Sequence, residues 1–358
     1  MQRRTLLGAT LVLAPALARA QGLVQPGTRL QFPRDHGAHP QHRTEWWYIT
    51  GALQAPAQAL PWGFQITFFR SRNDRAGDNP SVFAPRQLVF AHLAVTDLAG
   101  RQLLHDQRIA REGFGLAHAG TADTDLRLRD WSLQREGSVQ AALYRARLAS
   151  RDFGVQLDIA QTQPVLLQGQ AGYSRKGPDP SQASHYYSHP QMSVQGRLRL
   201  HDREHAVSGR AWLDHEWSEA LMHPEAVGWD WIGMNLDDGA ALTAFRLRRR
   251  DGNALWAGGS WRSPGQGVRS FGPDEVTFHP GRIWTSPATQ ARYPVEWTLV
   301  TPAGRFQVVS RLDAQELDSR GSTGAIYWEG FSELRDLRGR RLGQGYLEMT
   351  GYAAALRL

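Results

Sequence analysis

Alternation between apolar and polar positions dominates the chain. It is clear from Phe153 to Ile159, from Met192 to Leu200 and from Ala240 to Leu247, and a period of two is typical of strands with one buried face. Turn sequences such as Asp237-Asp238-Gly239 and Pro302-Ala303-Gly304 separate these runs. No segment beyond the first residues has convincing helical spacing. The pattern therefore predicts an all-β protein made of barrels or sandwiches.

One region interrupts this pattern near the middle of the chain. Residues Gly169 to Pro190 are rich in Gly, Ser, Pro and Gln, which indicates a loop or a domain junction. A boundary near residue 190 gives domains at residues 21–190 and 191–358, and each is of a size that suits one β-barrel.

The first 20 residues have the pattern of a secretory signal peptide. Arg3 and Arg4 precede an apolar run from Thr5 to Leu17, and Ala18-Arg19-Ala20 fits a cleavage site after Ala20. The apolar run is shorter than the roughly 20 residues that span a bilayer, which argues against a membrane anchor. The paired arginines also fit a twin-arginine signal, so the export route stays open. We expect a soluble mature protein in the periplasm.

Composition excludes several kinds of chemistry. The chain has no cysteine, which rules out disulfides, thiolate metal sites and a cysteine nucleophile. Its positive charges are scattered arginines, with Lys176 as the only lysine. Scattered arginines are typical of solvated strand faces, whereas a nucleic-acid partner would need a basic stripe. Nucleic acid is therefore not expected as a partner.

The most distinctive segment is Glu45-Trp46-Trp47-Tyr48. In a strand, Trp46 and Tyr48 share one face while Glu45 and Trp47 share the other. An aromatic plate of this kind suits the wall of a pocket for a large apolar molecule, and it equally suits a barrel core. On spacing alone, both interpretations stay open.

Three histidines precede this strand at every third position, His36, His39 and His42. Imidazole is a common metal ligand, but no regular element brings positions i, i+3 and i+6 to one side. We therefore expect hydrogen bonding beside the aromatic strand, with Glu45 anchoring Arg43 or His39, and no metal.

Two further clusters combine ionisable groups with tryptophan, Trp212 to Trp217 and Trp229-Asp230-Trp231. Apolar surroundings disfavour the charged form of a carboxylic acid, so such an acid can donate a proton at neutral pH, and aromatic faces stabilise a developing cation. The alternative is that the acids cap turns and the tryptophans fill barrels. The candidate catalytic residues are Asp214, His215 and Asp230. The candidate ligand-binding residues are Trp46, Tyr48, Trp217, Trp229, Trp231, His36, His39 and Glu45.

A last cluster joins Tyr327-Trp328-Glu329-Gly330 to the segment from Gly345 to Tyr352. We interpret both as closing strands of the second barrel. The chain has no Gly-x-Ser-x-Gly elbow, no His-Glu-x-x-His helix and no phosphate-binding glycine loop. Nothing in it supports a hydrolase nucleophile or an organic cofactor.

These clusters, in this order, resemble the family of secreted lipocalin-like proteins related to AttH and to carotenoid 1,2-hydratase. The resemblance covers nearly all of the mature chain and implies two lipocalin-like antiparallel β-barrels side by side. It is carried by Asp35-His36-Gly-x-His39-Pro40, Glu45-Trp46-Trp47-Tyr48-x-Thr50-Gly51, Asp214-His215-Glu216-Trp217, Gly228-Trp229-Asp230-Trp231 and Gly345-Tyr346-Leu347-Glu348-x-Thr350-Gly351-Tyr352.

The hydratase relatives imply an activity. They add water to a terminal isoprenoid double bond without an organic cofactor: an acid protonates the alkene and water captures the cation. Their His-x-Trp pair matches His215 and Trp217. Their Tyr-x-Asp is absent from the strand at Ala240 to Arg246, so Asp214, Asp230 or Glu45 would have to serve as the acid.

The resemblance thus implies binding of a large hydrophobic molecule, an isoprenoid, carotenoid or lipid. Two functions remain open. One is a cofactor-independent hydro-lyase similar to carotenoid 1,2-hydratase, and the other is a non-catalytic carrier that serves an ABC-type permease in the envelope.

Overall fold

The computed structural model describes residues 24–220 and 222–356. Strands dominate this part of the chain, and its helical elements are two short 3-10 turns, Arg34–His36 and Asp74–Ala76. The predicted all-β class is confirmed. The predicted signal peptide lies outside the described residues, and within them no helix is long and apolar enough to cross a membrane.

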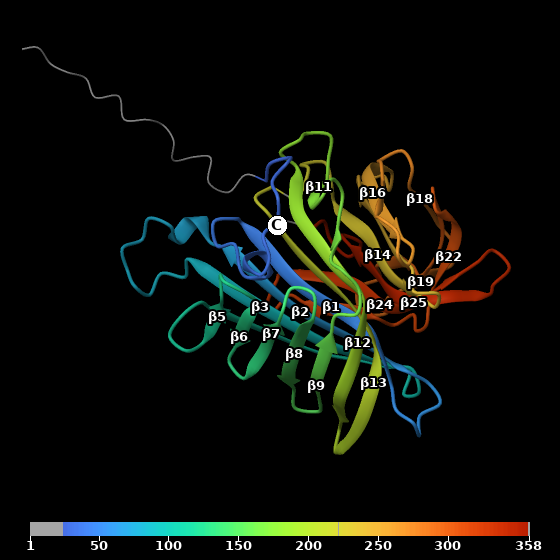
Figure 1. Cartoon of the computed structure of the whole chain (residues 1–358), viewed down its shortest axis with the longest axis horizontal. Coiled ribbons are helices and arrows are strands. Elements are labelled where there is room, and N and C mark those ends of the chain that lie inside the picture. Colours follow the sequence, from blue (N-terminus) through green and yellow to red (C-terminus); the bar gives the residue numbers. More distant parts are fainter. Residues whose placement is uncertain (1–23, 221, 357–358) are drawn as a thin grey trace, which may run out of the picture.

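The first sheet, sheet A, curves into a nearly closed barrel (Figure 1). Its strands follow the order β4-β3-β2-β1-β13-β12-β9-β8-β7-β6-β5, with β10 and β11 paired to β12. Apolar side chains on alternate positions fill the barrel. The strands are β1 Thr44–Gln54, β2 Trp62–Arg72, β3 Gln87–Asp97, β4 Gln102–Arg111, β5 Ala117–Ala119, β6 Asp125–Leu128, β7 Trp131–Gly137, β8 Ala142–Ala149, β9 Phe153–Ala160, β10 Leu166–Leu167, β11 Tyr173–Arg175, β12 Ala183–Leu200 and β13 Arg203–Ser218.

The second sheet, sheet B, follows the order β17-β16-β15-β14-β25-β24-β22-β21-β18, with β23 paired to β24. It has its own core around Ile232, Trp297 and Trp328. The strands are β14 Gly228–Leu236, β15 Ala241–Arg248, β16 Ala254–Arg262, β17 Arg269–Phe271, β18 Thr277–Pro280, β21 Glu296–Thr301, β22 Gly304–Ser310, β23 Glu316–Ser319, β24 Ala325–Arg335 and β25 Arg341–Thr350, and β19 Ile283–Thr285 pairs separately with β20 Arg292–Pro294.

The boundary between the two sheets differs from the expected one at residue 190. Strand β12 runs through that residue, and both β12 and β13 belong to sheet A, so the boundary lies between Ser218 and Gly228. Pro190 does not end the strand because a register shift between His189 and Met192 absorbs it. Within the segment from Gly169 to Pro190, which was expected to be a loop or a junction, Tyr173–Arg175 form β11 and the residues from Ala183 onward belong to β12. The loops that remain return the chain to sheet A.

The two sheets pack against each other through a third core. Tyr48 and Trp212 of sheet A meet Trp231, Phe331 and Tyr346 of sheet B. The outer faces of β1, β2 and β13 therefore face β14, β24 and β25, and a side chain on β1 points either into the barrel or toward the second domain.

Candidate functional site

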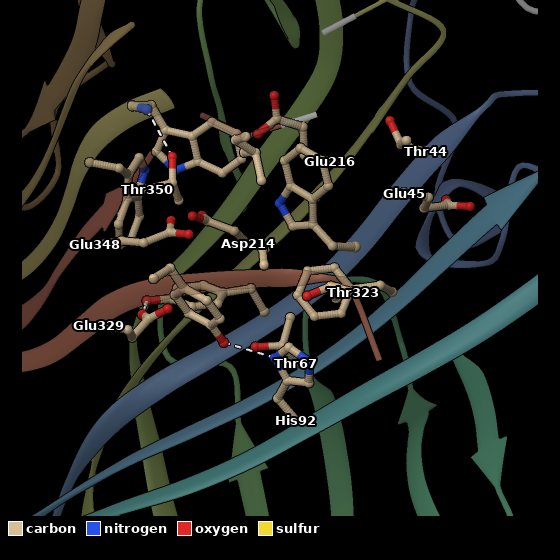
Figure 2. Close-up of a pocket in the computed structure, with 18 of the residues that line it drawn as sticks. Thr44, Glu45, Thr67, His92, Asp214, Glu216, Thr323, Glu329, Glu348 and Thr350 are labelled. Carbon is tan, nitrogen blue, oxygen red and sulfur yellow. Dashed lines mark hydrogen bonds between the residues drawn. The ribbon is translucent and has the colours of Figure 1, made fainter. Parts of the chain in front are cut away.

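A cavity of about 300 Å³ lies between the two sheets (Figure 2). The structure thus places the pocket between the domains. Most of the surface that lines it is apolar, and several carboxyl groups are set into it. A cavity of this size is at the lower end of the range for sites that hold small organic ligands.

Sheet A contributes two transverse rows of side chains to the cavity. Strand pairing aligns Trp46 with Glu216 and Tyr48 with Asp214. Because residues two apart on a strand share a face, both rows point the same way. The first row comprises Phe90, Phe69, Trp46, Glu216 and Tyr186, and the second comprises His92, Thr67, Tyr48 and Asp214.

Sheet B opposes these rows with two rows of its own. Glu329 pairs with Glu348, which in turn pairs with Trp231. The first row comprises Glu329, Glu348, Trp231 and Phe245. The second row comprises Tyr327, Thr350, Trp229 and Leu247. Both domains therefore contribute carboxyl groups and aromatic side chains to the cavity, and neither domain supplies all of its lining.

Among the acids of the cavity, Asp214 is held by three side-chain hydrogen-bond donors. Its carboxyl oxygens accept hydrogen bonds from Tyr186 Oη at 2.8 Å, Ser188 Oγ at 2.5 Å and Trp212 Nε1 at 2.7 Å. Burial raises the pKa of Asp214 to about 7, although these three donors oppose the rise. At neutral pH the group is therefore present in both protonation states, which suits proton transfer.

Two glutamates of sheet B also face the cavity. Burial raises the pKa of Glu348 to about 7, and the nearby Asp214 carboxyl adds to the rise. Burial and the Glu348 carboxyl hold the pKa of Glu329 well above its usual range. Glu329 accepts hydrogen bonds from Tyr48 Oη and from Gln65 Nε2. In Figure 2 the carboxyl groups of Asp214 and Glu348 point toward one another.

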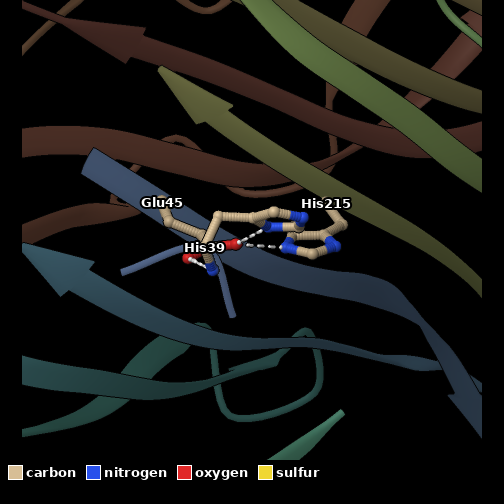
Figure 3. A group of neighbouring side chains, drawn as sticks. All are labelled: His39, Glu45 and His215. Atoms are coloured by element: carbon tan, nitrogen blue, oxygen red, sulfur yellow. Dashed lines mark hydrogen bonds and ion pairs between the residues drawn. The ribbon is translucent and has the colours of Figure 1, made fainter. Parts of the chain in front are cut away.

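A different network lies on the other face of β1 and β13, inside the first barrel (Figure 3). Glu45 Oε1 is 2.7 Å from His39 Nδ1 and 2.9 Å from His215 Nε2, and Glu45 Oε2 accepts a 2.8 Å bond from Arg70 Nε. Trp217 stacks on His39 with ring centres 3.8 Å apart. Glu45 does anchor His39, as expected, but its arginine partner is Arg70 rather than Arg43.

These contacts fix the charges of the network. Burial would raise the pKa of Glu45, but His39, His215 and Arg70 hold it well below its usual value. Burial would lower the pKa of His39, yet Glu45 and Asp35 keep it raised. Burial lowers the pKa of His215 to about 4. The ion pair is therefore protonated His39 with ionised Glu45, while His215 is neutral.

His39, Glu45 and His215 also form the closest approach to a metal-binding group among the described residues, with one ligand atom from each lying within 4.8 Å of the others. However, both oxygens of Glu45 already accept hydrogen bonds, one of them from Arg70. A guanidinium beside the carboxylate disfavours a second cation there. We interpret the group as a hydrogen-bonded network.

The structure separates the three candidate catalytic residues. Asp214 faces the cavity, whereas His215, the next residue of β13, points into the first barrel. Asp230 lies on the far face of β14, where it pairs with Arg246 at 2.7 Å and Arg248 at 3.1 Å and accepts a hydrogen bond from Tyr352. His215 and Asp230 therefore do not share a site with Asp214.

The candidate ligand-binding residues divide in the same way. Trp46, Tyr48, Trp229 and Trp231 line the cavity. Glu45 borders it, but its carboxylate serves the barrel network. His36, His39 and Trp217 lie in the barrel interior, as shown by their contacts with Tyr187, Glu45 and His39 respectively.

Sequence reasoning missed several cavity residues. Glu329 and Glu348 were interpreted as parts of closing strands, and Lys176 as part of a polar loop. One signal was available: in Trp328-Glu329-Gly330 and Leu347-Glu348-Met349 an acid alternates with apolar or small residues. An acid in that pattern faces away from its own barrel core, and here the first domain covers it.

Comparison with known proteins places the chain in a family. A family model described as AttH-like matches residues 23–352. The chain belongs to the AttH-like family. A crystal structure from Nitrosomonas europaea, provisionally named AttH, is 46% identical in sequence to this AttH-like protein, covers 92% of this chain and 99% of its own, and has a TM-score of 0.85. No curated protein matches significantly.

Two more distant structures share the fold. Kievitone hydratase from Nectria haematococca has a TM-score of 0.69 at 13% identity, over 93% of this chain and 96% of its own. CghA in complex with Sch210972 has a TM-score of 0.53 at 11% identity, over 87% and 89%. These likenesses support the predicted lipocalin-like, two-domain architecture of the AttH-like protein.

Proposed function

We propose that the cavity binds an apolar, isoprenoid-like molecule and adds water to its double bond by acid catalysis. The observation that carries this proposal is the placement of buried carboxyl groups, with pKa values of about 7 for Asp214 and Glu348, in a cavity lined by tryptophans. The fold that this protein shares with kievitone hydratase is consistent with the proposal.

The chemistry uses two acids in different protonation states. Protonated Asp214 gives its proton to one alkene carbon, and the other carbon becomes a cation that the faces of Trp46, Trp229 and Trp231 stabilise. Water attacks the cation, and ionised Glu348 takes the excess proton. Proton return from Glu348 to Asp214 closes the cycle, so that alkene and water give an alcohol. Two acids with pKa values near the working pH suit this exchange.

The cavity volume limits the substrate. A space of about 300 Å³ suits a short isoprenoid or the end of a longer one, whose remainder would extend outside. Periplasmic location is part of the proposal and rests on the signal pattern of residues 1–20.

Incubation with acyclic isoprenoids in ¹⁸O-labelled water tests the proposal. We expect an alcohol that carries the label, and a loss of about 100-fold or more in rate for Asp214→Asn with ligand affinity retained. The matched control is Asp230→Asn, because Asp230 is also flanked by tryptophans but lies outside the cavity; its folded fraction should keep the wild-type rate.

Tight binding without turnover, equal in wild type and Asp214→Asn, would contradict catalysis. That result would favour the alternative of a carrier for lipid-like cargo that serves an ABC-type permease.

A further inference from the structure

Lys176 occupies an unusual position for its residue type. It is the only lysine of the chain, whose other side-chain cations are arginine and histidine. Lysine is normally exposed, yet Lys176 is 6% exposed and lines the cavity. It lies in the loop between β11 and β12, so the segment that looked like a polar linker delivers one cation to an apolar site.

The surroundings of Lys176 come from both domains. Its Nζ is 3.0 Å from Glu216 Oε1. The same atom is 4.7 Å from the ring centre of Tyr186 and 4.2 Å from that of Phe245. Glu216 and Tyr186 belong to sheet A and Phe245 to sheet B, so the ammonium group lies where the two domains meet.

An ion pair alone explains this arrangement poorly. A structural pair with Glu216 could use arginine, which the chain uses everywhere else and which holds a carboxylate with two parallel hydrogen bonds. An ammonium group has three hydrogens to donate, and among the described residues Glu216 is its one carboxylate partner. The aromatic faces stabilise the positive charge but accept little hydrogen bonding. Donor capacity is left for a ligand.

We propose that Lys176 binds an oxygen acceptor of the ligand, so that the cavity takes an apolar molecule with one neutral hydroxyl or carbonyl group. This inference rests on the proposed function, whose substrate class it narrows. A hydrocarbon would leave the donor unsatisfied. A carboxylate ligand would bring a further negative charge beside Glu216, Asp214 and Glu348.

The position of Lys176 also fixes where the oxygen lies. Its partner Glu216 and the acid Asp214 are two residues apart on one face of β13, which corresponds to roughly 7 Å along the strand. The oxygen of the ligand is thus held about that far from the carbon that Asp214 protonates. The two polar contacts orient a chain-like molecule along β13, with the tryptophans beside its apolar part.

Three probes of matched skeleton test the inference: farnesene, farnesol and farnesoic acid. Quenching of the cavity tryptophans measures their affinities. In wild type we expect farnesol to bind about tenfold more tightly than farnesene, as for a hydrogen bond to a charged donor, and farnesoic acid to bind no better than farnesol. In Lys176→Met the preference for farnesol should disappear while farnesene still binds.

Loss of the cation leaves the Glu216 carboxylate buried without its partner, which could unfold the single variant. The double variant Lys176→Met with Glu216→Gln removes both charges and should also lose the preference for farnesol. Arg175→Met is the control for the loop, because the Arg175 side chain packs over Trp256, with its guanidinium carbon 4.8 Å from the ring centre, outside the cavity lining. It should keep the preference for farnesol, and Lys176→Arg should keep part of it.

The single lysine also permits a direct measurement. Protein labelled with ¹⁵N-lysine has one side-chain ammonium signal, and farnesol should shift it more than farnesene does. Equal affinities for farnesol and farnesene in wild type, or a preference that survives in Lys176→Met, would overturn the role of Lys176 and leave the apolar cavity intact. Failure of all three probes to bind would contradict both proposals.

Discussion

Glu329 of β24 lies directly opposite Glu348 of β25, and both carboxyl groups face the cavity between the domains. Like charges at paired positions of two strands repel each other, and here burial removes the water that would screen them. Burial is the main cause of the raised pKa of Glu329, and the Glu348 carboxyl raises it further. Protonation of either carboxyl removes this repulsion.

The raised pKa of Glu348, caused first by burial and then by nearby carboxyl groups such as Asp214, predicts how stability depends on pH. The pKa of Glu348 is raised to about 7 in the folded protein, so the folded state holds its proton more tightly than the unfolded state does. The resulting stability is fully present below the unfolded pKa, near 4, and is lost as pH rises through 7. We expect Glu348→Gln to match wild type at about pH 4 and to exceed its free energy of unfolding by up to about 3 kcal/mol at about pH 8.

Urea denaturation at both pH values measures this difference. Glu204→Gln is the control, since Glu204 is exposed on the surface beside Arg197. A variant that is less stable than wild type at the higher pH would show that Glu348 is held as an ion.

Asp230 is expected to matter for stability and not for chemistry. Its side chain is fully buried and pairs with Arg246 and Arg248. Asp230→Asn leaves the buried Arg248 and the mostly buried Arg246 without a counter-charge, which should lower the free energy of unfolding by about 3 kcal/mol. The half-exposed pair of Asp158 and Arg147 offers a comparison, because Asp158→Asn should cost about 1 kcal/mol or less. Equal small effects of the two substitutions would show that the Asp230 pairs contribute little.

Close approach of the two domains depends on Gly63 of β2. A Cβ at this position would lie 2.6 Å from Tyr346 Oη and 2.7 Å from Phe331 Cβ, both in sheet B. Gly63→Ala should therefore push the sheets apart and cost about 1–3 kcal/mol. Calorimetry would detect a lower Tm, and tryptophan fluorescence would detect a more open cavity. Gly267→Ala, which adds its methyl group in open space, should leave both unchanged.

Sequence patterns predicted the fold and the alternation of faces, but they could not say what lies beyond each face. The separation of Glu45 from Trp46 and Tyr48 followed from the period of two. The same rule separates Asp214 from His215, yet their adjacency and their shared motif made them look like one site. Neighbouring residues of a strand point to opposite faces, and each face of β13 meets a different core. Asp214 and His215 therefore lie in different sites although they are adjacent in sequence.

The remaining errors have a common physical origin in long-range contacts. Asp230 lies between two tryptophans in sequence, and only the pairing of β14 with β15 shows that arginines neutralise it. Glu348 lies far from Asp214 in sequence, and only the packing of the two sheets brings their carboxyl groups together. Lys176 is placed by the path of a loop, which no periodic pattern describes.

Placement of the cavity between the sheets has a consequence for any fragment of this protein. Asp214 belongs to the first domain, but Trp231, Phe245 and Glu348, which cover the same cavity, belong to the second. An isolated first domain would expose Asp214 to water and so remove the burial that raises its pKa, while the donors Tyr186, Ser188 and Trp212 of the same domain would remain. The proton affinity of this acid is thus a property of the assembled pair of domains, and neither half of the gene encodes it alone.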